Sequence, residues 1–186
     1  MNTAKTILFF LILIIHNLVY GQSQSTNSEK DKIQLSDWKS LQKDEFTIKY
    51  PSNWDLDESG RMGTSFYLFS QLSDKDDIFR ENINLVIQDL KGYDLTLDEY
   101  VEISEKQIKS LFYNVQVSLN DRIREGTTEY QKVIYSGEKG TLHLKFEQCY
   151  WVIGDKAFVL TLTCEENEFD NYQSIGESIF DTFEIK

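Results

Sequence analysis

An acidic stretch with the letters D-L-D-E-S-G is one of two places where the residue types of this chain could bind a ligand. Asp55, Asp57 and Ser59 match positions one, three and five of a helix-loop-helix calcium loop, and Gly60 matches position six. Such a loop needs a bidentate acid at position twelve, where this chain has Phe66. We therefore expect an acidic turn here. Calcium at Asp55, Asp57 and Ser59 remains the alternative.

A second acidic cluster follows in the next loop. It contains Asp74, Asp76, Asp77 and Glu81. These carboxylates could bind a divalent ion loosely, but runs of charge usually form solvated faces. We expect an exposed loop tip.

A catalytic nucleophile with its base is difficult to assemble from this sequence. His143 is the only histidine outside residues 1–21. If Gly154 begins a two-residue hairpin turn, Lys145 pairs with Cys164 and His143 lies diagonal to that cysteine, about 7 Å away. A bulge in the hairpin would instead move Cys164 to the other face. No third group orients the pair, so we expect no enzyme activity and no loss of function when His143 or Cys164 is changed.

The same register argues against a disulfide. It pairs Cys149 with Leu160, which leaves Cys149 and Cys164 about 13 Å apart along the strands. A disulfide requires Cα atoms within about 7 Å. We expect two free, mostly buried thiols.

The N-terminus has the pattern of a secretory signal peptide. Lys5 precedes an apolar run from Ile7 to Ile15, and Gly21 is a small residue suited to cleavage. This run is about half the length needed to cross a bilayer, although an uncleaved signal anchor is the alternative. No cysteine near Gly21 could carry a lipid. The sequence predicts a signal peptide at residues 1–21 and a mature protein that is periplasmic or secreted.

The mature chain is strongly acidic and forms one domain. The whole chain has a net charge of −12, and cleavage would remove one lysine and no acid. This charge argues against binding to nucleic acid or to anionic membranes, and it suits basic partners or divalent cations. Residues 22–37 lack apolar periodicity and predict a polar tether, which leaves a single domain at residues 38–186.

Changes in apolar periodicity predict a succession of strands and two helices. Thr96 and Glu99 form a capping box at the start of the first helix, and Asn167 is the expected cap of the second. The expected apolar face of the first helix comprises Leu97, Tyr100, Val101, Ser104, Ile108, Leu111 and Phe112. The expected strands are 38–42, 46–50, 66–70, 83–90, 114–119, 129–135, 141–153 and 156–163.

These elements indicate an α+β domain with an antiparallel sheet. Both faces of the final hairpin carry apolar residues, and one helix cannot cover both. We therefore expect helices on opposite faces of the sheet. Pro51 ends the second strand and directs Trp54 toward the core.

Four segments resemble the PsbP-like superfamily: F-T-I-K-Y-P-S-N-W, G-E-K-G-T-L-H-L-K-F, W-V-I-G-D-K-A-F-V-L-T-L-T and I-F-D-T-F-E-I-K. The resemblance covers about residues 38–186. It implies an αβα sandwich that acts by docking to another protein, as an envelope accessory module. The photosystem member helps to retain calcium and chloride, but no metal-binding motif of that protein is matched here, so no ligand is implied.

The many aromatic residues are expected to pack mainly in the core, with a minority in an exposed docking patch beside the acidic surface. The leading hypothesis is thus a non-catalytic protein-binding module, and the alternative is a binder of a small ligand or of calcium. The aromatic residues concerned are Tyr50, Trp54, Phe66, Phe69, Tyr130, Tyr135, Phe146, Tyr150, Trp151 and Phe158.

Overall fold

The computed structural model describes residues 37–186. The predicted signal peptide and nearly all of the predicted tether lie outside the described residues. Those two assignments therefore stay predictions.

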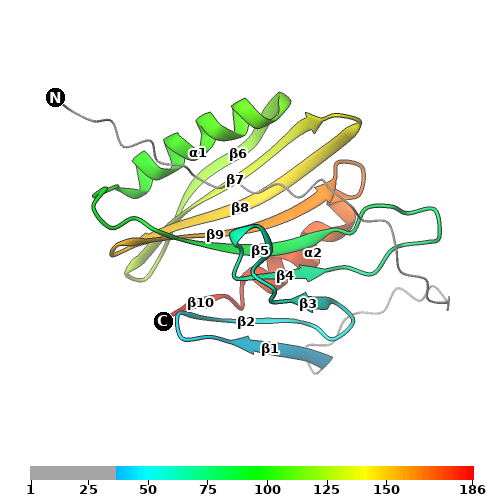
Figure 1. Cartoon of the computed structure of the whole chain (residues 1–186), viewed down its shortest axis with the longest axis horizontal. Coiled ribbons are helices and arrows are strands. Elements are labelled where there is room, and N and C mark those ends of the chain that lie inside the picture. The colour runs from blue at the N-terminus through cyan, green and yellow to red at the C-terminus, as the bar shows by residue number, and fades with distance from the viewer. Residues whose placement is uncertain (1–36) are drawn as a thin grey trace.

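Strands dominate the described chain, and two helices interrupt their succession (Figure 1). The strands are β1 (Trp38–Gln42), β2 (Phe46–Pro51), β3 (Asp55–Asp57), β4 (Phe66–Phe69), β5 (Asn82–Asp89), β6 (Tyr113–Glu125), β7 (Thr128–Lys139), β8 (Leu142–Ile153), β9 (Lys156–Glu165) and β10 (Glu184–Ile185). The helices are α1 (Leu97–Leu111), α2 (Phe169–Phe180) and a 3₁₀ turn, η2 (Arg61–Gly63).

The strands form two antiparallel sheets. The larger sheet has seven strands in the order β3-β4-β5-β9-β8-β7-β6, and the smaller has three in the order β1-β2-β10. The predicted α+β class with an antiparallel sheet is confirmed.

Three two-residue hairpins determine the register of the last four strands of the large sheet. Their turns begin at Gly126, Gly140 and Gly154, whose φ angles are +61°, +62° and +57°. A positive φ at the first turn residue alone defines the type II′ hairpin, since the second residues of these turns do not have positive φ, and glycine takes that first position without steric cost. Ile153 pairs with Lys156 as predicted, and the expected pairs of both cysteines follow from it.

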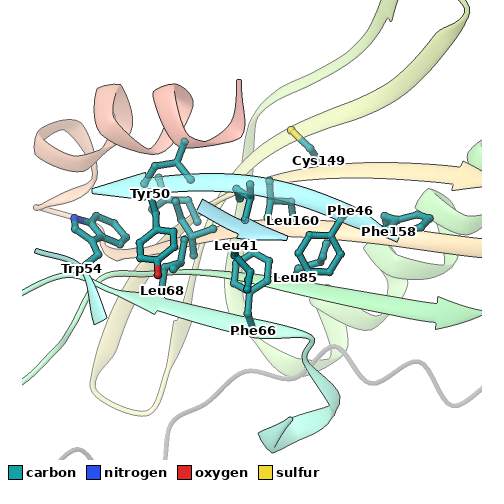
Figure 2. Close-up of a cluster of buried hydrophobic side chains, with 14 of the residues drawn as sticks. Leu41, Phe46, Tyr50, Trp54, Phe66, Leu68, Leu85, Cys149, Phe158 and Leu160 are labelled. Atoms are coloured by element: carbon teal, nitrogen blue, oxygen red, sulfur yellow. The ribbon is translucent and has the colours of Figure 1, made fainter. Parts of the chain in front are cut away.

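Alternate residues of β9 belong to two different cores. The first core lies between the large sheet, α2 and the small sheet (Figure 2), and the second lies between the large sheet and α1. This division follows from the period of two in a strand. From β9, the first core takes Phe158, Leu160, Leu162 and Cys164, and the second takes Ala157 and Val159.

The small sheet is the main departure from the predicted architecture. The sequence analysis expected only helices to flank the strands, whereas α2 shares its core with β2 and its neighbours. The strand β10 closes this sheet by pairing with β2, and Lys186 N donates to Glu45 O at 3.0 Å. A two-residue strand has no periodicity, so it could not be predicted from the pattern.

The helix starts were predicted unequally well. At α1, Thr96 and Glu99 form the expected capping box, in which Glu99 N donates to Thr96 Oγ1 at 3.3 Å. At α2 the cap is Glu168 in place of Asn167, and it makes no side-chain capping bond. Leu111, assigned to the apolar face of α1, is 38% exposed because the helix ends there.

Trp54 is buried in the first core, as predicted, and Trp54 N donates to Pro51 O at 3.0 Å.

The strand β6 extends well beyond the predicted 114–119. Its second half is charged and largely exposed, so no apolar alternation marks it.

Candidate functional site

A cavity of about 220 Å³ opens between the β4–β5 loop and the start of α2. Its lining contains six carboxylates and no basic residue. The lining residues are Ser73, Asp74, Asp76, Asp77, Glu81, Glu165, Glu168 and Tyr172. The structure thus brings the predicted acidic cluster of the β4–β5 loop together with three residues from the β9–α2 region.

The β4–β5 loop is shaped by hydrogen bonds from its own backbone. Asp74 Oδ1 accepts from the backbone nitrogens of Asp76 and Asp77 at 2.8 and 3.1 Å. Asp77 Oδ2 accepts from the nitrogen and the hydroxyl of Ser73 at 2.8 and 3.0 Å. Short acidic and hydroxyl side chains stabilise turns in this way. The loop therefore presents its carboxylates in a defined arrangement.

Glu81 brings a buried carboxylate to the cavity wall. It is 2% exposed, and its Oε2 accepts a hydrogen bond from Ser70 Oγ at 3.2 Å. Burial raises the pKa of Glu81, and the nearby charges of Asp77 and Glu165 raise it further. No lysine, arginine or histidine among the described residues forms an ion pair with it. The cavity is therefore a region of concentrated negative potential.

Tyr172 is the aromatic residue of the cavity wall. Burial, followed by the charge of Glu81, raises the pKa of Tyr172 to about 12, so its phenol stays protonated at neutral pH. Its ring meets that of Trp54 edge-on, with centroids 6.4 Å apart. The first core therefore supports one wall of the cavity.

This lining suits a positively charged organic group. Within residues 37–186, no three Asp, Glu, His or Cys side chains converge closely enough to hold a metal ion. Carboxylates spread around a cavity can instead accept hydrogen bonds from an ammonium or guanidinium group. Such charge-assisted hydrogen bonds are stronger than hydrogen bonds between neutral groups.

The calcium candidates of the sequence analysis lie elsewhere, and arginines already occupy their carboxylates. Asp55 pairs with Arg80 at 2.5 Å, and Asp57 pairs with Arg61 at 2.9 Å. Asp57 Oδ1 also accepts from Ser59 N at 2.8 Å, and this bond lowers the pKa of Asp57. Asp55 and Asp57 belong to strand β3, which pairs with β4, so the expected acidic turn is limited to the residues that follow Asp57.

The histidine and cysteines do not form a reactive pair. Lys145 pairs with Cys164 in the predicted register, but that thiol is 0% exposed, whereas the His143 side chain is 63% exposed. His143 Nδ1 lies 3.7 Å from Glu138 Oε1. Both cysteines are free and buried, as predicted, and burial raises the pKa of each thiol.

The predicted aromatic docking patch does not form from the residues named for it. All of them are buried or half-buried, so they build the cores. Among the described residues, Tyr113 at the start of β6 is the aromatic side chain that is largely exposed, at 76%. The sequence analysis did not single out this residue.

The sequence analysis also missed Glu165, Glu168 and Tyr172 as partners of the acidic loop. They follow the loop by about ninety residues, and no local pattern links the two segments. The two segments have only one feature in common in the sequence: each contains several acidic residues near an aromatic residue.

Comparisons with known proteins place the fold. No family model and no curated protein matches the sequence. Among solved structures, the cyanobacterial PsbP (CyanoP) of Synechocystis sp. PCC 6803 aligns with a TM-score of 0.61 and 15% identity, over 86% of this chain and 98% of that one. LpqN of Mycobacterium tuberculosis, described as involved in cell envelope biogenesis, aligns with a TM-score of 0.60 and 19% identity, over 80% and 90% of the two chains.

A third structure, PA94 of Pseudomonas aeruginosa, a protein of unknown function described as a putative regulator, aligns with a TM-score of 0.56 and 11% identity, over 78% of this chain and 94% of that one. The described chain therefore has a PsbP-like fold. None of the helices described in residues 37–186 combines the length and apolarity needed to cross a membrane.

Proposed function

We propose that this protein is an exported, non-catalytic accessory module of the cell envelope that binds another protein through its acidic cavity. The partner inserts a lysine or arginine side chain between the β4–β5 loop and α2. The observation that carries this proposal is the cavity lined by six carboxylates and no basic residue.

Three further facts support the proposal. The net charge of −12 attracts basic partners over distance and accelerates their association. The similar LpqN is described as acting in cell envelope biogenesis. The N-terminal sequence predicts export.

The test is capture followed by measurement with purified components. The mature chain from Gln22 is cross-linked to envelope proteins of its own cell, and the captured protein is identified, purified and titrated calorimetrically. The variant Asp76→Asn/Glu168→Gln should bind at least about tenfold more weakly, and the loss should shrink as salt rises. The control Asp44→Asn/Glu184→Gln removes two exposed carboxylates elsewhere and should bind as wild type. Equal affinity of both variants would refute the cavity as the docking site.

A second candidate is binding of calcium by the carboxylates of the cavity, three or more of which would have to move together, because none of the described acidic side chains converge in groups of three in this structure. A free calcium concentration one hundred times the dissociation constant would raise the free energy of unfolding by about 2.7 kcal/mol. The measurement is the melting temperature in calcium and in chelator. If the calcium-dependent rise in melting temperature is lost in Asp76→Asn/Glu168→Gln, the cavity is the calcium site. If the rise is lost only in Asp57→Asn, the calcium site lies at Asp57, at the end of β3. No shift in the wild type excludes both sites.

A further inference from the structure

The strand β6 forms one edge of the seven-stranded sheet, and no strand in the described chain pairs with its outer side. It is thirteen residues long and contains neither proline nor lysine, two residues that commonly protect edges. Bulges interrupt its pairing with β7 before Leu119, but the register is regular from Leu119 to Glu125. This second half is therefore a regularly paired edge, and no described strand pairs with its outer side.

The hairpin turn determines which backbone groups of this edge point outward. Glu125 pairs with Thr128 across a two-residue turn, so these two residues exchange both backbone hydrogen bonds. Bonded and non-bonded pairs alternate along an antiparallel ladder. The N–H and C=O groups of Asn120, Arg122 and Arg124 therefore face away from β7.

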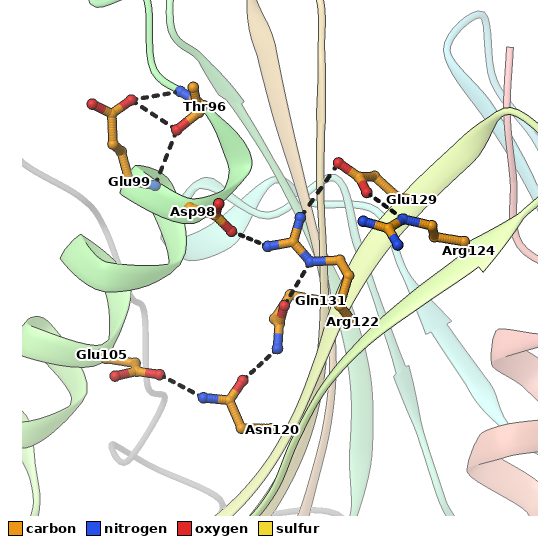
Figure 3. A network of polar contacts seen from close by, with 9 residues as sticks. All are labelled: Thr96, Asp98, Glu99, Glu105, Asn120, Arg122, Arg124, Glu129 and Gln131. Carbon is orange, nitrogen blue, oxygen red and sulfur yellow. Dashed lines mark hydrogen bonds and ion pairs between the residues drawn. The ribbon is translucent and has the colours of Figure 1, made fainter.

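The side chains of these three residues are held back from the edge. Each is bonded over the face of the sheet that α1 covers (Figure 3). Their partners are Asp98, Glu129 and Gln131 for Arg122, Glu105 and Gln131 for Asn120, and Glu129 for Arg124. The outward backbone groups are therefore not screened by their own side chains.

The opposite face of this edge carries unpaired acid. Asp121 and Glu125 are exposed and form no ion pair with any described residue, and Ile123 lies between them. A strand added to this edge would place its side chains opposite these three. Basic residues opposite the two acids and an apolar residue opposite Ile123 would match them.

A second copy of this chain fits this edge poorly. Antiparallel pairing of β6 with itself about Ile123 sets Asp121 against Glu125 and Arg122 against Arg124. Pairing about Arg122 sets that residue against its own copy. Like charges directly opposite one another destabilise a sheet.

We propose that the edge of β6 from Leu119 to Glu125 binds an extended segment of a partner protein in which basic and apolar residues alternate on one face. The segment adds antiparallel to the large sheet. Backbone hydrogen bonds to Asn120, Arg122 and Arg124 provide the affinity, and contacts with Asp121 and Glu125 provide the selectivity. This surface is separate from the acidic cavity.

The test uses the full mature chain and a peptide of the sequence Lys-Thr-Val-Thr-Lys-Thr-Val-Thr. Nuclear magnetic resonance should show at least tenfold slower hydrogen exchange at the amides of Asn120, Arg122 and Arg124 when the peptide is present at up to about 1 mM. A peptide with glutamate in place of lysine should give no protection. Absence of protection by the lysine peptide, or equal protection by both peptides, would overturn the proposal.

Two pairs of variants separate backbone pairing from charge. Arg124→Pro removes an outward N–H that β7 does not use and should abolish binding, whereas Arg124→Ala should retain it. Asp121→Lys/Glu125→Lys should weaken binding at least tenfold, and Asp44→Lys should not. Binding that survives Arg124→Pro or the double lysine variant would contradict the model.

The cavity variant Asp76→Asn/Glu168→Gln should bind the peptide as wild type, since its substitutions lie away from β6. This result distinguishes a failure of the edge from a failure of the proposed cavity. Loss of peptide binding in the cavity variant would assign the peptide to the cavity and overturn the edge proposal.

Discussion

The half-buried Lys132 of β7 provides the sharpest test of how the sheet binds α2. Lys132 Nζ lies 2.8 Å from Glu147 Oε1 on β8 and 3.0 Å from Glu177 Oε1 on α2. The Glu147 side chain is 1% exposed and that of Lys132 is 18% exposed. Burial alone would lower the pKa of Lys132, but its bonds to both glutamates outweigh it and raise the pKa.

Replacing Lys132 with methionine keeps the length of the side chain and removes its charge. Glu147 then remains buried without a counter-charge, and breaking such a pair typically costs about 3–5 kcal/mol. Because Lys132 is still partly exposed, we expect the free energy of unfolding to fall by about 3 kcal/mol at pH 7, near the lower end of that range. Replacing both residues, Lys132→Met/Glu147→Leu, should recover most of this loss, because apolar residues can substitute for a buried pair.

The loss must depend on pH in a defined direction. Burial raises the pKa of Glu147 in the folded protein despite the attraction of Lys132, and removing that lysine raises it further. Below the unfolded value, near 4.3, Glu147 is protonated in both states and no charge is buried. The deficit of Lys132→Met should therefore be small at about pH 4 and should grow as the pH rises through the folded pKa.

Urea unfolding followed by tryptophan fluorescence at both pH values measures this deficit. The control Lys106→Met breaks an exposed pair with Glu102 on α1 and should change stability little. A deficit under about 1 kcal/mol at pH 7, or one that is equal at both pH values, would refute the reasoning.

Three further predictions concern packing, capping and the thiols. Gly176→Ala should lower the free energy of unfolding measured in urea by about 1–2 kcal/mol, although alanine favours helices. The new Cβ would lie 2.7 Å from a methyl group of the fully buried Leu162. Unchanged or higher stability would show that Leu162 moves aside without cost. Thr96→Ala should cost about 1 kcal/mol in the same assay, since it removes the capping box of α1, while Thr96→Ser should cost less. A thiol reagent at about pH 8 should label neither Cys149 nor Cys164 in the native protein and both in urea, because burial raises their pKa; rapid native labelling would contradict their placement.

Local signals in the sequence were strong enough to predict the β8–β9 hairpin and the start of α1. A glycine at the first position of a two-residue turn determines a strand register, so placing Gly154 correctly also placed Cys149 opposite Leu160. Thr96 and Glu99 predicted a helix start because their reciprocal bonds depend only on residues three apart. These features need no distant partner.

Other features depended on contacts between distant segments. β10 is a strand only because β2 offers it a ladder, and the second half of β6 is a strand only because β7 pairs with it. An edge strand with charged side chains on both faces has no apolar alternation to reveal it. The acidic cluster of the β4–β5 loop could be predicted from the sequence. Its cavity could not, because the other wall comes from the distant β9–α2 region.

The sequence by itself determined the acidic charge, the antiparallel α+β class, the register of the β8–β9 hairpin and the burial of two free thiols. These follow from composition, from apolar period and from turn residues, which act over a few positions. Only the tertiary structure decided that Asp76 lies across a cavity from Glu168, that arginines occupy Asp55 and Asp57, and that the edge of β6 is open. Each of these depends on which segments pack together in three dimensions, and that is decided by burial of the whole core, not by any local pattern.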